Sequence, residues 1–461
     1  MTLNEDQTMS PVLSAPSLAR QFAIRCSSDW CSALTADELM TLQSIVRTAL
    51  IDTAACILAG RNETVTQLVS HCKLEGSSAN VKSASVFFGD AKIRPATAAL
   101  LNGVSGHALD FDDVGLAGHP SVVIVPALLA DCESRGISGE PVVQAYAKGY
   151  AIWAELDRRM RTSLHEHGWH PTSVFGVVAA AGALAALRGL NESAFVNVIG
   201  IAASFAGGVV SNFGSMTKPL HAGRAAESAI VAADLGEAGV TASEDSLDGK
   251  AGLLLALCGS EQADVKSIIP AFFERAALDR RPGVKQYPVC YAAHRGIDAM
   301  LDLRAKFGVK PEDVATLTVT ISETNAAVLR HHQPRNVGEA RFSMEFALAS
   351  ALVYGRLGIR EVSQSALEDP RVRSVMRLVR TQTVRTSCPF EPTFAYADEL
   401  QLELQDGTVA ESGPVRFARG HRELPLGEDQ IRQKLLGCVN SDEQQFAEHV
   451  EKRMTDLLLT R

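Results

Sequence analysis

Apolar residues recur at helical spacing through the first half of the chain. Up to about residue 259, Ala-rich runs carry apolar side chains at steps of three and four and are interrupted by Gly and Pro, which predicts successive buried helices. The clearest run is 36–58, with Thr35 in position to cap its first turn, and another is 222–235. A glycine shortly after each run predicts where the helix ends.

The pattern changes after about residue 264, where apolar and polar residues begin to alternate. Leucine, valine and isoleucine alternate with threonine over 317–321, and leucine alternates with polar residues over 400–404, just before an Asp-Gly pair at 406–407. Period-two alternation next to a turn predicts strands of an antiparallel sheet. The closing stretch, 427–459, returns to charged helix with apolar stripes and should pack back on the first helices.

These patterns predict a mainly α fold with two domains. With 461 residues the chain exceeds the size at which one hydrophobic core usually stops growing. We expect a large all-helical domain built from both chain ends, 1–264 plus 420–461, with a smaller α+β domain, 265–419, inserted between them.

Composition and charge narrow the class of protein. Hydrophobic residues make up 46% of the chain and charged residues 21%, as is typical of folded globular proteins. The net charge of −9 argues against a nucleic-acid or anionic-membrane partner, because a polyanion is repelled except at a local basic site. An anionic substrate must therefore meet a focused basic pocket.

Other features of the sequence indicate a cytoplasmic protein. The first residues lack the basic and then apolar order of a secretory signal. The apolar runs 174–187 and 198–210 are shorter than the roughly 18 to 20 residues that a membrane-spanning helix needs. The nine cysteines are scattered without CxxC pairs, which favours reduced thiols.

Four stretches concentrate titratable residues beyond what packing requires. The first, 102–121, holds the following group: His107, Asp110, Asp112, Asp113 and His119. An EF-hand is excluded, because Val114 and Ser121 stand where calcium ligands are needed. A helix that ends in an Asx-capped loop remains the plain structural alternative.

The second stretch, 164–176, places three histidines before a helix that Pro171 can open. Their spacing does not reproduce the HExxH arrangement of zinc proteases, so a metal site is not favoured. His170, at the helix entrance, is instead a candidate acid or base, because histidine titrates near physiological pH.

The third stretch, 212–228, brackets the start of an Ala-rich helix with Lys218, His221 and Arg224. Free N–H groups at a helix N-terminus next to basic side chains favour an anion site. An ordinary loop with solvated basic residues is the alternative. Removing Lys218 should therefore lower turnover more than binding, if its charge stabilises a carboxylate that gains charge during the reaction.

The fourth stretch, 280–298, adds Arg281, Lys285 and Cys290. Nothing nearby marks the Cys290 thiol as activated, so we interpret it as a packed residue and not a nucleophile. The sequence has no GxGxxG after a strand, no GxxxxGK[ST] and no GxSxG, which argues against nucleotide-binding and α/β-hydrolase functions.

These stretches resemble the MmgE/PrpD family, which includes 2-methylcitrate dehydratase, cis-aconitate decarboxylase and iminodisuccinate epimerase. The matching strings occur in register from residue 107 to residue 355. They are HALDFDD with GHPS, then HPTS, TKPLHAGRAAESA, KQYPVCYAAHRGIDA and RFSMEFALASALVYG. One such string is weak evidence, whereas five in order are specific.

The resemblance implies a homodimer with a helical first domain, an α+β lid domain and no metal or organic cofactor. The catalytic positions of the family map onto Asp110, His119, His170 and Lys218. For binding of a small polycarboxylate substrate we expect Lys285 on the lid together with Arg281, His107 and His221. Lysines suit carboxylates and histidines suit proton transfer.

Two departures from the decarboxylase pattern bear on the reaction. Val114 stands in place of a threonine and Phe346 in place of a tyrosine, so two hydroxyl donors are lost. We therefore favour an epimerase of iminodisuccinate or a similar amino-diacid. A 2-methylcitrate or citrate dehydratase, a cis-aconitate decarboxylase and a non-catalytic carboxylate-binding dimer are the alternatives.

Overall fold

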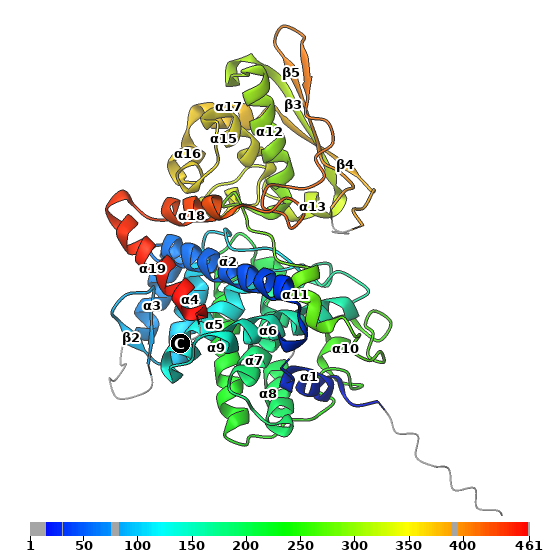
Figure 1. Ribbon diagram of the computed structural model, residues 1–461. Coiled ribbons are helices and arrows are strands. Elements are labelled where there is room, and N and C mark those ends of the chain that lie inside the picture. The colour runs from blue at the N-terminus through cyan, green and yellow to red at the C-terminus, as the bar shows by residue number, and fades with distance from the viewer. Residues whose placement is uncertain (1–14, 30, 75–82, 390–393, 460–461) are drawn as a thin grey trace, which may run out of the picture.

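The computed structural model of the chain describes residues 15–29, 31–74, 83–389 and 394–459. Figure 1 shows a larger body of helices with a smaller body of helices and strands above it. The helices of the larger part are α1 (Leu18–Ser27), α2 (Ala36–Gly60), α3 (Thr64–Leu74), α4 (Pro95–His107), α5 (Ser121–Arg135), α6 (Glu140–Arg159), α7 (Pro171–Leu187), α8 (Glu192–Ser204), α9 (Thr217–Glu237), α10 (Leu253–Cys258) and α11 (Ala276–Asp279).

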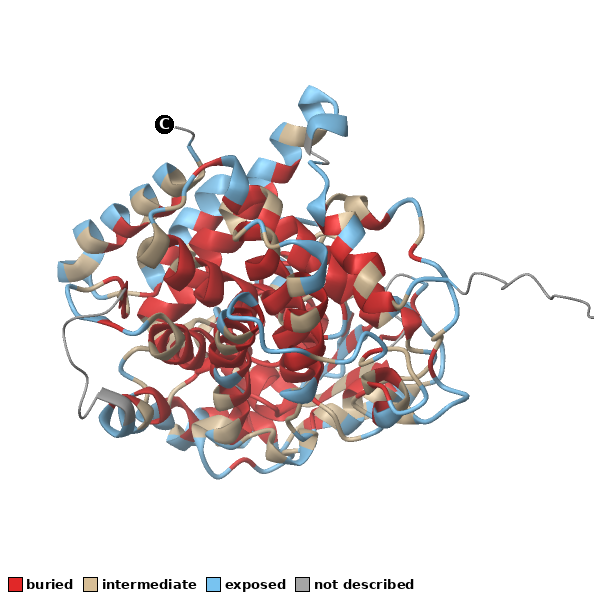
Figure 2. Ribbon diagram, turned by 90° about the horizontal axis from the view of Figure 1, so that it is seen from below, coloured by how far each residue is buried: buried red, intermediate tan, exposed pale blue. Residues whose placement is uncertain are grey.

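Each of the two parts has its own cluster of buried hydrophobic residues. One cluster joins buried residues in 18–284 with others in 431–454, and a second joins buried residues in 287–410. The last two helices, α18 (Glu428–Gly437) and α19 (Gln444–Leu458), pack against α2 as the sequence predicted. Seen from below, the buried segments gather at the centre and the exposed ones at the rim (Figure 2).

The smaller part packs helices on one mixed sheet. Its elements are α12 (His294–Phe307), β3 (Val314–Ser322), α13 (Glu323–Val328), α14 (Val337–Ala340), α15 (Met344–Tyr354), α16 (Gln364–Glu368), α17 (Pro370–Met376), β4 (Val379–Val384), β5 (Glu399–Leu404) and β6 (Val409–Glu411). The strand order is β4-β3-β5-β6, with β3 parallel to β4 and antiparallel to β5. The predicted strands are confirmed, but the prediction of a purely antiparallel sheet is wrong. The helices between β3 and β4 form a crossover that returns the chain in the same direction.

Local capping signals decide where the helices begin. Thr35 and Glu38 form a capping box at the start of α2, as the sequence predicted for its first turn. Helix α9 begins five residues earlier than predicted, because Pro219 is tolerated in a first turn, where N–H groups have no helical partner. As a result, Lys218 and His221 lie within the helix and not before it.

The larger part is not purely helical. A short antiparallel pair, β1 (Ala84–Ser85) and β2 (Lys92–Ile93), lies between α3 and α4, so the prediction of an all-helical domain is wrong in this detail. Among the described residues, α2 is the one helix long and apolar enough to cross a membrane, but 72% of its apolar window is buried inside the protein, as in a core helix. The division into folding units at residues 264 and 420 stays a prediction.

Helices α4 and α9 cross at two glycines. A Cβ added at Gly103 would lie 2.7 Å from Gly223 Cα, and one added at Gly223 would lie 2.4 Å from Leu100 O. The two backbones therefore meet with no side chain between them. The crossing places the C-terminal turn of α4, which ends at His107, next to the first turns of α9, which carry Lys218.

Candidate active site

The loop that joins α4 to α5 carries a buried carboxylate between two lysines. Asp110 Oδ1 lies 2.7 Å from Lys218 Nζ and 2.9 Å from Lys285 Nζ, and none of the three side chains is more than 5% exposed. Asp110 has a φ of +52°, in the left-handed region that residues other than glycine seldom adopt. The loop is therefore held in one constrained shape at this residue.

Backbone hydrogen bonds bring Lys285 to this loop. Val114 N donates to Gly283 O and Gly283 N donates to Val114 O, both at 2.8 Å. Two residues further on, Lys285 Nζ donates to Asp110 O at 2.9 Å. Lys218 arrives from the first turn of α9, so three segments far apart in the sequence meet at Asp110.

Opposite charges decide the protonation state of Asp110. Burial on its own would raise the pKa of this carboxyl, but the charges of Lys218 and Lys285 outweigh burial and hold the pKa well below its usual range. Asp110 is thus ionised at neutral pH. Lys218 donates to Asp110 Oδ1, and Lys285 contacts Asp110 O and Oδ1, so each ammonium retains at least one N–H donor for a second anion.

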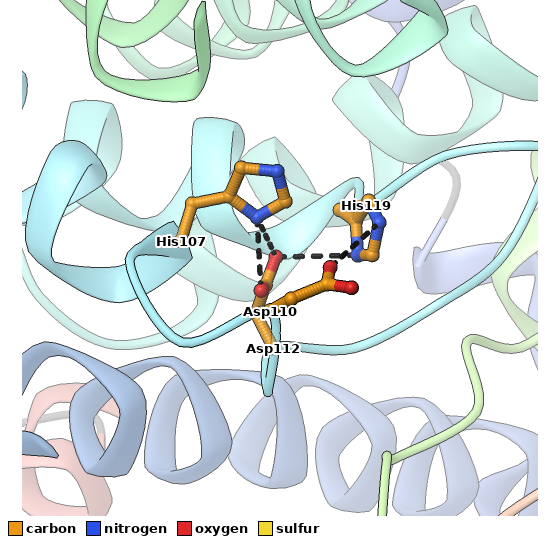
Figure 3. A group of neighbouring side chains, drawn as sticks. All are labelled: His107, Asp110, Asp112 and His119. Carbon is orange, nitrogen blue, oxygen red and sulfur yellow. Dashed lines mark hydrogen bonds and ion pairs between the residues drawn. The ribbon is translucent and has the colours of Figure 1, made fainter. Parts of the chain in front are cut away.

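Two histidines point at a second carboxylate in the same loop (Figure 3). His107 Nδ1 lies 2.9 Å from both carboxylate oxygens of Asp112, and His119 Nδ1 lies 3.3 Å from Asp112 Oδ2. Because a carboxylate only accepts, His107 donates from Nδ1 and keeps a lone pair on Nε2. That Nε2 is buried and has no hydrogen-bond partner among the described residues.

His119 is oriented by the backbone of its own loop. Its Nδ1 lies 2.8 Å from Asp113 O, and a carbonyl oxygen can only accept, so Nδ1 carries the proton. Its Nε2 then holds the lone pair and lies 3.6 Å from Asp110 Oδ1. A proton that arrives at this Nε2 would be stabilised by the carboxylate.

A second pair of histidines lies beside the first. His170 is the residue directly before α7, and its Nδ1 lies 3.1 Å from His221 Nδ1 on α9. The rings of His170 and His107 are stacked, with centroids 5.8 Å apart. Only one of two facing Nδ1 atoms can carry the proton, so the pair presents His170 Nε2 either as a donor or as an acceptor, according to the tautomer.

Burial keeps these histidines neutral. It lowers the pKa of His170 and of His119 well below the usual value, in His119 despite the carboxylate of Asp112. Burial, followed by the charges of His107 and Lys218, lowers the pKa of His221 to about 4. Neutral imidazoles next to ionised lysines can accept a proton from a bound acid.

Four side chains of the site have the donor atoms of a metal centre. Ligand atoms of His107, Asp110, Asp112 and His119 lie within 4.8 Å of one another. The donor set does not fit a divalent cation well, because Asp110 Oδ1 already lies within 2.9 Å of two ammonium groups, which would repel it. The expectation that no metal is needed stays a prediction.

Comparison with known families covers both parts of the chain. Residues 27–266 match the MmgE/PrpD N-terminal domain, and residues 287–458 match the MmgE/PrpD C-terminal domain.

The chain belongs to the MmgE/PrpD family. It is similar to human cis-aconitate decarboxylase, with 27% identity over 77% of this chain and 75% of the relative. The mouse enzyme of the same name is 26% identical over 75% of this chain and 72% of its own length. A cis-aconitate decarboxylase-like protein of Aspergillus oryzae, oryM, is 26% identical over 85% of each chain. The resemblance inferred from the sequence motifs is thus confirmed at the level of the family.

In this member of the MmgE/PrpD family, most of the predicted site residues meet at one place. The structure brings together His107, Asp110, His119, His170, Lys218, His221 and Lys285. Arg281 instead donates from Nε and Nη2 to Arg422 O, at 3.2 and 2.6 Å, so these groups hold the C-terminal segment. Its assignment as a substrate ligand stays a prediction. Burial raises the pKa of the Cys290 thiol to about 11, which supports its interpretation as a packed residue.

Sequence reasoning missed a third basic residue at the site. Arg341 is 9% exposed, its Nη1 donates to Ala108 O at 3.1 Å, and its Nη2 lies 3.7 Å from Glu63 Oε2. Its buried Nε has no hydrogen-bond partner among the described residues. The available signal was its place at the start of the last family string, RFSMEFALASALVYG.

The buried residue His294 predicts how the stability of the folded protein depends on pH. Burial, followed by the charge of Lys285, lowers the pKa of His294 to about 3. As the pH falls below about 6.5, the unfolded chain takes up a proton that folded His294 does not, so stability is lost on acidification. In His294→Gln this loss should be smaller by up to about 1.4 kcal/mol per pH unit between about pH 6.5 and 3.

Urea unfolding of both proteins at pH 7.5, 6 and 5 measures this effect. The same substitution at His449, which is exposed on α19, is the matched control. An identical pH dependence in wild type and His294→Gln would contradict the prediction.

Proposed function

We propose that this protein is a cofactor-independent acid–base enzyme that acts on a small polycarboxylate. The observation that carries the proposal is the arrangement of two buried lysines on Asp110 with neutral histidines beside them. Lysines hold and polarise carboxylates, and neutral imidazoles move protons at the adjacent carbon. A protein that only binds carboxylates needs the lysines but not the oriented histidines.

We assign the electrostatic role to Lys218. An ammonium has three N–H donors, and Lys218 gives one of them to Asp110 Oδ1 at 2.7 Å, so it retains donors for a substrate carboxylate. It is the second residue of α9, where the helix dipole adds positive potential. The ammonium charge and the helix dipole both stabilise the enolate-like carboxylate that forms when a proton leaves the α-carbon of the substrate.

We assign proton transfer to the histidines. His170 contacts His221 through Nδ1, which leaves its Nε2 available to a substrate. Asp112 accepts from His107 Nδ1, so His107 Nε2 carries a lone pair. Lys285 and Arg341 bind the distal carboxylates in this proposal. Lys218, Lys285 and Arg341 thus offer hydrogen-bond donors to a substrate with more than one carboxylate.

Epimerisation of iminodisuccinate or a similar amino-diacid is the first candidate reaction. One neutral imidazole takes the α-proton and becomes imidazolium, and the electron pair passes into the carboxylate. A second histidine, which the negative charge of the bound substrate keeps protonated, returns a proton to the opposite face and becomes neutral. The presence of more than one histidine at the site favours this reaction, as does the lack of a hydroxyl at Val114 and Phe346. A dehydratase must in addition protonate a departing hydroxyl group.

Decarboxylation of cis-aconitate is the second candidate, because the relatives named above carry that activity in their names. Here the bond to one carboxylate breaks, carbon dioxide leaves, and a protonated histidine gives its proton to the carbanion and becomes neutral. The same lysines stabilise the charge in either reaction.

Incubation with substrates in deuterated water tests the proposal and separates the reactions. Iminodisuccinate, 2-methylcitrate, citrate and cis-aconitate are followed by NMR, each with and without EDTA. Deuterium uptake without net loss indicates an epimerase, a new alkene a dehydratase, and carbon dioxide release a decarboxylase. We expect one of these signals, unchanged by EDTA. Inactivation by EDTA with rescue by a divalent ion would overturn the cofactor-independent mechanism, and calorimetric binding without any turnover would indicate a binding protein.

A further inference from the structure

A lysine outside every motif of the sequence contacts the loop between α4 and α5, residues 108–120, which we call the catalytic loop. Lys434 projects from α18, near the C-terminus, and its side chain is 5% exposed. Its Nζ lies 2.6 Å from Asp52 Oδ1 on α2 and donates to Phe111 O at 2.7 Å. The ammonium also lies 3.9 Å from the centre of the Phe111 ring, within the range of a cation–π contact.

In the sequence, Phe111 lies between Asp110 and Asp112, the two carboxylates of the site. Asp110 O accepts from Lys285 and Phe111 O accepts from Lys434, so two successive carbonyls of the loop are each held by a buried ammonium. The first of these carbonyls belongs to Asp110, whose φ is +52°, and the second belongs to the residue that follows it. Buried carbonyls that lose their donors are costly, so the two lysines stabilise the strained backbone that aims the Asp110 carboxylate.

Phe111 belongs to the hydrophobic cluster of the larger part and is 6% exposed. Phe111 and Lys434 also line a cavity of about 440 Å³, together with segment 355–359. The Phe111 ring is thus packed in the core, while its carbonyl accepts from Lys434 Nζ. Burial opposes the charge of Lys434, but Asp52 outweighs burial and raises the pKa to about 12, which keeps the donor charged.

We infer that Lys434 is a positioning residue of the catalytic loop: it couples the C-terminal helix α18 to the backbone of Phe111 and so fixes the direction of Asp110. The alternative is an ion pair that merely joins α18 to α2. This role rests on the proposed function, but hydrogen exchange tests it without a substrate. A failure of the inferred role of Lys434 is therefore distinguishable from a failure of the proposed reaction.

The test compares variants that keep or remove the donor to Phe111 O. Asp52→Asn removes the ion pair and keeps the Lys434 amine, whose N–H can still donate to Phe111 O, whereas Asp52→Asn with Lys434→Met removes both side chains' charges and the donor. Arg432→Met is the matched control, because Arg432 lies on the same helix and pairs with Glu448 and Glu451. Hydrogen–deuterium exchange of 107–119 is read by peptide, with kcat and KM on any substrate that is turned over.

In the double variant we expect exchange in 107–119 to rise at least about tenfold, and kcat to fall at least about tenfold with KM within about threefold of wild type. Asp52→Asn and Arg432→Met should both leave exchange in this segment within about threefold. The inference is overturned if the folded double variant keeps wild-type exchange in 107–119, or if Asp52→Asn raises exchange as much as the double variant does.

A second measurement applies if the double variant does not fold. In wild-type protein at low denaturant, 107–119 should lose protection in the same opening that unfolds α18. Independent opening of the two segments would overturn the inference.

Discussion

Replacing Lys218 by methionine is expected to lower kcat by about two to three orders of magnitude and to change KM far less. The Lys218 ammonium lies 2.7 Å from Asp110 Oδ1 and is almost fully buried, so no water replaces its charge when it is removed. The charge that develops on the substrate carboxylate is larger in the transition state than in the ground state. Steady-state kinetics on the substrate identified by NMR measures both constants.

Two further variants separate the roles of the site residues. His170→Ala should lose about two to four orders of magnitude in kcat if it moves a proton, whereas Lys285→Ala should mainly raise KM if its contact is equal in ground and transition states. Lys452→Met, on the exposed face of α19, is the control for removal of a lysine. If folded Lys218→Met and His170→Ala each kept more than about a tenth of wild-type turnover, the assignment would move to His107 and His119, because such losses are too small for general acid–base catalysis.

Local signals in the sequence predicted the parts of the fold that depend on few residues. Thr35 and Glu38 cap α2 through side chains only three residues apart, and Pro171 opens α7 at the predicted place. The direction of β4 was not predictable in this way. Whether β4 runs parallel to β3 depends on the path of the 56 residues between Ser322 and Val379, which no local pattern records.

The candidate site, too, was predictable only where the signal lies in a short segment of the sequence. Asp110, His170 and Lys218 were found because each lies in a short string that is rich in titratable residues and resembles a family motif. Lys434 lies among ordinary charged residues of a surface-like helix, and its contact with Phe111 spans 323 positions. Such a residue becomes visible only once α18 is packed against α2.

Substitution of Gly223 by valine is expected to lower the free energy of unfolding by about 3 kcal/mol or more, because added atoms in a close-packed site force backbone shifts. The Cβ alone would lie 2.4 Å from Leu100 O and 2.8 Å from Val104 N. Both are atoms of the α4 backbone, which cannot rotate away as a flexible side chain can. Thermal and urea unfolding measure the loss.

Gly437→Val on α18 is the matched control, since a Cβ there meets nothing within 4 Å and the variant reports only the change in helix propensity. A Gly223→Val protein as stable as Gly437→Val would contradict the close crossing of α4 and α9. The same crossing sets the distance from Lys218 on α9 to Asp110 just beyond α4. Any Gly223→Val protein that does fold should therefore lose turnover as well, because the two helices must separate before the valine fits, and Lys218 moves with α9.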